Sequence, residues 1–417
     1  MTQLSSWSPR RRTAAWLVAL GLVCALELAT HTAGRSGFLA SSRPVNSPND
    51  QIPAEGYVTW IGTLPVLQDS IGFLTLGGLF LGERGPEGSG ILDRRAAYAY
   101  LATLFIPWAG AYRGFLVLNW LFWWGASAAA FWFVRHRWRD IPLAVVTSLL
   151  VAGGNGFIFM AGTPMSYCAA YATFLLILSL GEQLDAFAPS PRLSTWFLLG
   201  WAGGVASTIY FAHIPLLLFW WVYGARRVPW RCLAAATLVT LAISLAWEIS
   251  GRTLVGLSFA TDNSAAVGDS VGAWLANARR PWQDVLVYFR GGPLAGAAAI
   301  RGTLISAFPY PWWLLGAAGF AASRAADRSW ALALVMAGLL PAIVILSLIP
   351  LPRAAFYMYP AVYVMAARGA LVLGRLTRLR WAAVGAAVAV LVFAGNLDLL
   401  GSDLLITRFH HSAGAAW

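Results

Sequence analysis

Three carboxylates lie close together between residues 47 and 73, in the segment SPNDQIPAEGYVTWIGTLPVLQDSIGF. They are Asp50, Glu55 and Asp69, and the last two have apolar and aromatic neighbours. Such surroundings hold a carboxylate at an interface rather than in open water, which suits the role of a general base. Ordinary solvated loop charges would have the same composition. Each of the three is therefore a candidate for acid–base chemistry.

Basic residues elsewhere could bind an anion. Arg353 follows a proline just before a late apolar run, at the depth of lipid phosphates, and a guanidinium binds phosphate with two parallel hydrogen bonds. An interfacial anchor is the alternative interpretation. His213 opens another apolar run and is a weaker binding candidate. Arginines and aromatic residues alternate between residues 279 and 301, ending at Arg301, although an interfacial helix has the same composition.

The composition predicts what kind of protein positions these residues. Hydrophobic residues make up 59% of the 417 residues and charged residues only 11%. So few charges could not cover a water-exposed surface, which excludes a set of soluble domains. All 29 basic residues are arginines, and the net charge is +12. In a chain this apolar, the excess indicates charge beside membrane helices, and a nucleic-acid partner is not expected.

Apolar runs long enough for membrane helices recur along the chain. The clearest runs are 13–30, 115–134, 141–162, 166–181, 194–211, 213–224, 231–249, 304–322, 329–349, 355–373 and 381–399. Two more, 66–82 and 96–111, are short or interrupted and are either thin spans or interfacial helices. The sequence therefore predicts an all-α, polytopic transmembrane bundle of about 11–13 spans, with short interfacial helices in the first external loop. Residues 1–417 form a single integral membrane domain.

The arginines predict the orientation of this bundle. Arg10, Arg11 and Arg12 precede the first run, so the N-terminus is expected in the cytoplasm. Alternate threading then places the short arginine-dense connections on the same side. Two long segments remain on the external side: residues 31–112, the first external loop, and residues 250–303, the second.

Under this threading the two sides differ in charge. The cytoplasmic side holds 16 arginines and four acids, whereas the external side holds 13 of each. The excess charge is therefore an orientation signal confined to one side. Glu27 and Glu248 lie near external helix ends, where a boundary charge is the simpler interpretation, although Glu27 falls within the first apolar run.

The segment AEGYVTWIGTLPVLQDSIGF resembles the start of the first external loop of bacterial GT-C glycosyltransferases. Many members show an acidic residue followed by Gly and Tyr, a run to Leu-Pro, and then a second acidic residue. Here these are Glu55, Gly56, Tyr57, Leu64-Pro65 and Asp69. Looser similarities follow in order: NWLFWWGASAAAFWFVRHRW, GTPMSYCAAYATF, WAGGVASTIYFAHIPLLLFWWVYGARR and PRAAFYMYPAVYVMAARG.

The resemblance implies an enzyme of a bacterial-type inner or plasma membrane that takes a sugar from a polyprenyl-phosphate carrier. The acceptor would approach from the external side, and membrane lipids would surround the chain. Glu55 would be the base, with Asp69 orienting the acceptor or helping to bind a divalent cation, and Asp50 in reserve. Tyr57, Arg353, Tyr357, His213 and Arg301 are the substrate-binding candidates.

The sequence departs from the family pattern at the catalytic position. Members often have Asp where this chain has Glu55, and many carry two adjacent acidic residues that are absent here. The base therefore stays open between Glu55, Asp50 and Asp69.

Two other functions are alternatives. A transporter or flippase for a lipid or small solute would carry ionisable residues near mid-membrane, whereas here the acids cluster outside the apolar runs. An oligosaccharide polymerase or ligase would be expected to carry essential arginines and a histidine in a late external loop. Residues 250–303 contain arginines but no histidine, which ranks this reading third.

Overall fold

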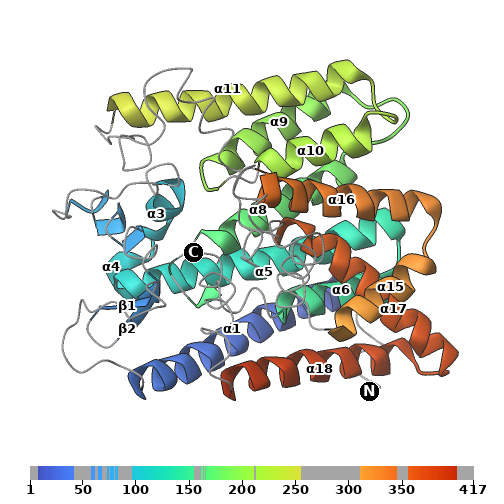
Figure 1. Ribbon diagram of the computed structural model, residues 1–417, viewed down its shortest axis with the longest axis horizontal. Helices are drawn as coiled ribbons and strands as arrows, with labels where there is room; N and C mark the ends of the chain where they lie inside the picture. The colour runs from blue at the N-terminus through green and yellow to red at the C-terminus, as the bar shows by residue number, and fades with distance from the viewer. Residues whose placement is uncertain are drawn as a thin grey trace, which may run out of the picture.

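A bundle of long helices forms the body of the protein (Figure 1). The computed structural model describes residues 8–41, 58–61, 64–67, 73–74, 76–78, 80–82, 96–154, 161–162, 164, 166–210, 213–254, 310–344 and 356–401. Within these ranges each of the eleven predicted apolar runs contains one long helix. They are α1 (Pro9–Ser41), α5 (Ala111–Trp138), α6 (Ile141–Ala152), α8 (Tyr167–Gln183), α9 (Leu193–Ser207), α10 (His213–Gly224), α11 (Trp230–Leu254), α15 (Tyr310–Ala321), α16 (Ala325–Val344), α17 (Tyr359–Leu376) and α18 (Trp381–Gly401).

Three of the described helices are long and apolar enough to cross a membrane: Arg10–Ala29, Ala111–Trp138 and Trp230–Trp247. Three more are apolar but shorter: Ile141–Ala152, His213–Gly224 and Trp381–Val392. A helix rises about 1.5 Å per residue, so about 20 residues are needed to cross the hydrocarbon core. The polytopic all-α fold is thus confirmed, while the full number of spans stays a prediction.

Short turns join consecutive helices at one end of the bundle. These turns contain Arg139, Arg192, Arg226 and Arg227, Arg324, and Arg378, and we call this the arginine-rich end. The start of α1 lies at the same end, because Nη1 of Arg135 in α5 donates a hydrogen bond to Oγ1 of Thr13 at 3.2 Å. The arginine-dense connections therefore gather on one side, as the sequence predicted.

Helix α5 runs through the middle of the bundle and packs against α1, α6 and α8 (Figure 1). Two residues join α5 to α6: Arg139 ends α5, and Asp140 caps the start of α6. Arg139 adopts the left-handed conformation with φ 52°, and the Asp140 carboxylate accepts a hydrogen bond from the Leu143 amide at 3.0 Å. This side-chain cap satisfies an amide that the helix leaves free.

The parts of the first loop that the structure describes lie at the opposite end of the bundle, which we call the loop end (Figure 1). Its described parts include α3 (Ala96–Ala102) and α4 (Ile106–Ala109). Neither of these two helices alone is long enough to cross a bilayer, and the interfacial position of residues 96–111 stays a prediction. They pack with Phe73 and Leu76 against Phe115 of α5, in a small apolar core separate from the main core of the helical bundle.

The first loop also contains an element that the sequence analysis did not predict. Strands β1 (Val58–Ile61) and β2 (Leu64–Leu67) pair antiparallel, with Val58 opposite Leu67 and Ile61 opposite Leu64. The sequence predicted short interfacial helices in this loop and no strands. Two apolar runs separated by two residues that begin with Gly are a hairpin signal, but Pro65 in the second run argued against a strand.

Candidate functional site

Most of the predicted site residues lie outside the described residues. These are Asp50, Glu55, Tyr57, Asp69, Arg301 and Arg353. Tyr357 and His213 are described, and both belong to elements that pack against α16. The roles proposed for all eight stay predictions.

The hairpin connects the segments that hold Glu55 and Asp69. Val58 follows Glu55 by three residues, and Leu67 precedes Asp69 by two. Because Val58 and Leu67 are paired, the two chain positions from which those segments leave the hairpin are neighbours.

Tyr357 lies in the short helix η4 (Phe356–Met358), which leads into α17. Its side chain is buried, and its ring lies 5.1 Å from the ring of Phe174 in α8, between centroids. Gly338 of α16 allows the close approach of η4, because a Cβ there would lie 2.9 Å from the Tyr357 carbonyl carbon. Tyr357 is thus packed between two helices.

Tyr357 is one of several aromatic residues between α8 and α17. Tyr171 of α8 and Tyr359 of α17 have ring centroids 6.2 Å apart, and Tyr363 lies one turn further along α17, 5.9 Å from Tyr359. Residues four apart lie on one face of a helix, so a tyrosine-lined seam runs between the two helices. The three rings are buried.

His213 is the first residue of α10, at the loop end as expected. Its ring is half-buried and interacts with the Tyr210 backbone through a hydrogen bond. Tyr210 in turn packs edge-on against Tyr167 at the start of α8, with centroids 5.3 Å apart. His213 therefore caps a turn between helices, which fits the structural reading of a histidine at a helix end.

A buried hydrogen-bonded relay holds the first loop on the bundle. The Tyr98 hydroxyl of α3 donates to Oδ1 of Asn119 in α5 at 2.7 Å, and Nδ2 of Asn119 donates to the Ala161 carbonyl at 3.1 Å. The Tyr112 hydroxyl donates to the neighbouring Gly162 carbonyl at 3.1 Å. These residues were not predicted from the sequence, although an asparagine inside an apolar helix is a signal of a buried polar contact.

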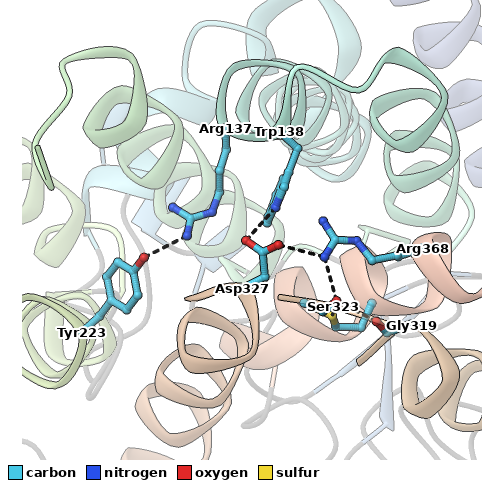
Figure 2. A network of polar contacts seen from close by, with 8 residues as sticks. Arg137, Trp138, Tyr223, Gly319, Ser323, Asp327 and Arg368 are labelled. Carbon is cyan, nitrogen blue, oxygen red and sulfur yellow. Dashed lines mark hydrogen bonds and ion pairs between the residues drawn. The ribbon is translucent and has the colours of Figure 1, made fainter. Parts of the chain in front are cut away.

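The arginine-rich end carries a different kind of polar cluster, and Figure 2 shows part of it, the contact between Arg137 and Tyr223. Arg137, near the end of α5, forms an ion pair with Glu182 of α8, and its Nη2 donates to the Tyr223 hydroxyl of α10 at 2.9 Å. The guanidinium also lies over the ring of Trp330, 5.3 Å from its centroid. Arg137 thereby joins three helices and the start of α16.

The next residue along the chain, Trp138, belongs to a second cluster at the same end. Asp327 of α16 accepts from Trp138 Nε1 at 2.8 Å and from Arg368 Nη1 of α17 at 2.9 Å (Figure 2). Arg368 also donates to the Ser323 hydroxyl at 2.7 Å, which donates to the Gly319 carbonyl at 2.6 Å. The side chains of Arg368 and Asp327 are 17% and 13% exposed, so the pair is shielded from solvent.

The two clusters can fix helix ends, but they offer no recognisable catalytic set. Each arginine is matched by one carboxylate, so neither pair carries a net charge that would attract an ion. Among the described residues, no group of three or more His, Cys, Asp or Glu side chains could hold a metal ion. The candidates for a divalent cation, Asp50, Glu55 and Asp69, lie outside those residues.

Two solved structures resemble the chain over almost its whole length. The crystal structure of ArnT from Cupriavidus metallidurans bound to undecaprenyl phosphate matches 96% of this chain at a TM-score of 0.53 and 14% identity, over 76% of its own length. That of the apo oligosaccharyltransferase from Archaeoglobus fulgidus matches 99% at a TM-score of 0.50 and 13% identity. This chain spans only 57% of that protein. No family model and no curated protein matches the sequence.

At these identities the likeness establishes the fold and nothing finer. The chain has a GT-C fold, as the resemblance of its first loop predicted. Together with its apolar helices, this fold makes it an integral membrane protein.

Proposed function

We propose that this protein is a membrane glycosyltransferase that moves a sugar from a polyprenyl-phosphate carrier to an acceptor at the external face of the membrane. The observation that carries the proposal is the match of nearly the whole chain to a protein solved with undecaprenyl phosphate. The clustering of acidic residues in the sequence of the first loop supports it.

The reaction needs a base and a stabilised leaving group. Glu55 would take the proton from the acceptor hydroxyl as that oxygen attacks the anomeric carbon, and the sugar–phosphate bond breaks with its electron pair leaving on the carrier phosphate. Arg353 would offset the charge on that phosphate. Asp69 would orient the acceptor or help to bind a divalent cation, and Asp50 is the alternative for either role.

Tyr57, Tyr357, His213 and Arg301 are proposed to line the binding site. Aromatic faces stack on sugar rings, and arginine pairs with phosphate. The packing of Tyr357 against Phe174 supports a role in shaping this site rather than in proton transfer.

Sugar transfer in lipid tests the proposal directly. The purified protein is given polyprenyl-phosphate sugars, and wild type is compared with Glu55→Gln, Asp69→Asn and Asp50→Asn. We expect Glu55→Gln to lower kcat about 100-fold or more, because general-base catalysis contributes about 10²–10⁴. Repeating the assay with a chelator tests the cation requirement.

Asp185→Asn is the matched control, because it removes an exposed carboxylate at the arginine-rich end. Its φ of 49° is one that asparagine tolerates. Full activity in all three first-loop variants would refute the carboxylate mechanism.

The same preparation separates the alternative functions. A transporter or flippase would move labelled lipid or solute across vesicles without forming a glycosidic product. A polymerase or ligase would extend or transfer a preassembled oligosaccharide and ignore a single-sugar donor.

A further inference from the structure

Asn119 is the polar centre of the loop end. It lies within α5, and its side chain is completely buried beside the apolar Phe115 and Leu118. A buried amide without partners costs several kcal/mol in an apolar medium, so its hydrogen bonds decide whether it is tolerated. Both of its polar atoms are engaged, Oδ1 by Tyr98 and Nδ2 by the Ala161 carbonyl.

Tyr98 links Asn119 to an earlier part of the first loop, the chain around Phe73. Its ring is completely buried and meets the ring of Phe73 edge-on, with centroids 5.0 Å apart and an interplanar angle of 85°. It also contacts Phe115 at 5.3 Å. Phe73 follows Asp69 by four residues, so the contact fixes where the chain runs soon after that carboxylate.

Two segments therefore meet α5 at the Asn119 amide: α3, through Tyr98, and the chain at Ala161. The backbones are also close, because a Cβ on Gly114 of α5 would lie 2.9 Å from the Ile106 amide nitrogen of α4. An apolar pair could fill the same space with no desolvation cost. A polar pair instead favours one rotation of α3 about its contact with α5, because only that rotation satisfies the amide.

We propose that Asn119 and Tyr98 are positioning residues for glycosyl transfer, holding the first loop in the single orientation that the reaction needs. This inference rests on the proposed function. Neither residue is placed in contact with the substrate; they act through Phe73 and the chain that leads back to Asp69. The first loop, which carries the proposed catalytic carboxylates, is thus attached to the helical bundle at Asn119 of α5.

The test compares Tyr98→Phe, Asn119→Leu and the double variant with wild type. Tyr100→Phe is the matched control, because Tyr100 lies on the same short helix with 62% of its surface exposed. Either single variant leaves a buried polar group without its partner, so both should unfold at a lower temperature. The double variant is apolar at both positions and should recover part of that stability.

Activity separates positioning from stability. A small misplacement of reacting groups costs up to about 100-fold in rate, so we expect kcat of the folded double variant to stay at least about 10-fold below wild type. Donor KM should change by less than about twofold. If kcat recovers together with stability, the residues have a structural role only and the inference is wrong.

Hydrogen–deuterium exchange of residues 58–82 provides a readout that needs no substrate. We expect faster exchange there in Tyr98→Phe and no change in Tyr100→Phe. Unchanged exchange in Tyr98→Phe overturns the relay even if sugar transfer is confirmed. If wild type transfers no sugar while the exchange rises, the proposed function fails and the catalytic part of this inference fails with it.

Discussion

The two ends of the bundle are held together by different chemistry. At the arginine-rich end, Arg137 and Arg368 form ion pairs with Glu182 and Asp327, and these join α5, α8, α16 and α17. At the loop end, Tyr98, Asn119 and Tyr112 form neutral hydrogen bonds to one another and to backbone carbonyls. One end is fixed by charge, and the other by neutral polar groups set in an apolar core.

This difference matters because of what each end must do. Removing one partner of a buried ion pair typically costs about 3–5 kcal/mol, whereas a neutral hydrogen bond contributes about 0.5–1.5 kcal/mol. The arginine-rich end is thus suited to be a fixed base. The loop end is held in its orientation by weaker individual contacts, so we expect it to accommodate a change in packing at lower cost.

The largest expected effect comes from a single added methyl group. Gly369 of α17 lies against the Leu315 carbonyl of α15, and Gly319 of α15 lies against the Met365 carbonyl, so the two helices touch backbone to backbone. We expect Gly369→Ala to lower the free energy of unfolding by about 4 kcal/mol or more, because the clash is with backbone. Thermal unfolding in detergent measures it.

Two further glycine variants compare the ends. In Gly114→Ala the new Cβ would meet the Ile106 backbone at 2.9 Å, so we expect a smaller loss than in Gly369→Ala. Gly125→Ala is the control, since nothing lies within 4 Å of a Cβ there. An equal loss at Gly114 and Gly369 would contradict the idea that the loop end adjusts more easily.

The sequence predicted the scaffold well for simple physical reasons. Eleven apolar runs became eleven helices within the described residues, because each run is long enough to be helical and is bounded by polar turns. The gathering of the arginine-rich turns at one end also followed from the sequence, since short loops rich in arginine collect on one side of a membrane. Two of these arginines, however, also form ion pairs between helices, which the charge pattern does not predict.

Arg137 and Arg368 are two of the 16 arginines assigned from the sequence to the cytoplasmic side, with no partner predicted for either. Their partners lie 45 and 41 residues away along the chain, so no local spacing reveals the pairs. The relay at Asn119 likewise joins positions 21 and 42 residues apart. Contacts of this kind depend on how helices cross, which apolar periodicity does not determine.

The ion pairs give the next largest effect. In Asp327→Asn the charge that balances Arg368 disappears from a site that is 13% exposed, and we expect a loss of about 3 kcal/mol in unfolding free energy. Arg328→Gln, an exposed position next to it, should change stability by no more than about 0.5 kcal/mol. A loss of less than about 1 kcal/mol for Asp327→Asn would show that solvent screens this end.

A double-mutant cycle tests whether charge pairing is what stabilises the arginine-rich end. Arg137→Leu leaves the Glu182 carboxylate without its partner, and Glu182→Leu leaves the guanidinium without its own. We expect each single change to cost about 3 kcal/mol and the double change to cost less than their sum by about 1–3 kcal/mol. Strict additivity, measured by thermal unfolding, would mean that the two side chains do not stabilise each other.

The smallest expected effect makes the sharpest comparison, because the same atom is removed at each end. Tyr223→Phe deletes a hydroxyl that accepts from Arg137, whereas Tyr98→Phe deletes one that donates to the neutral Asn119. Hydrogen bonds to charged groups contribute about 1.5–3 kcal/mol and neutral ones about 0.5–1.5, so Tyr223→Phe should destabilise the protein more.

Activity should follow the opposite order. Tyr98 holds the loop that carries the proposed base, whereas Tyr223 lies at the far end of the bundle. We therefore expect sugar transfer by the folded protein to fall in Tyr98→Phe and to remain near wild type in Tyr223→Phe. If the variant that loses more stability also loses more activity, the two ends do not divide scaffold from chemistry, and activity follows overall stability instead.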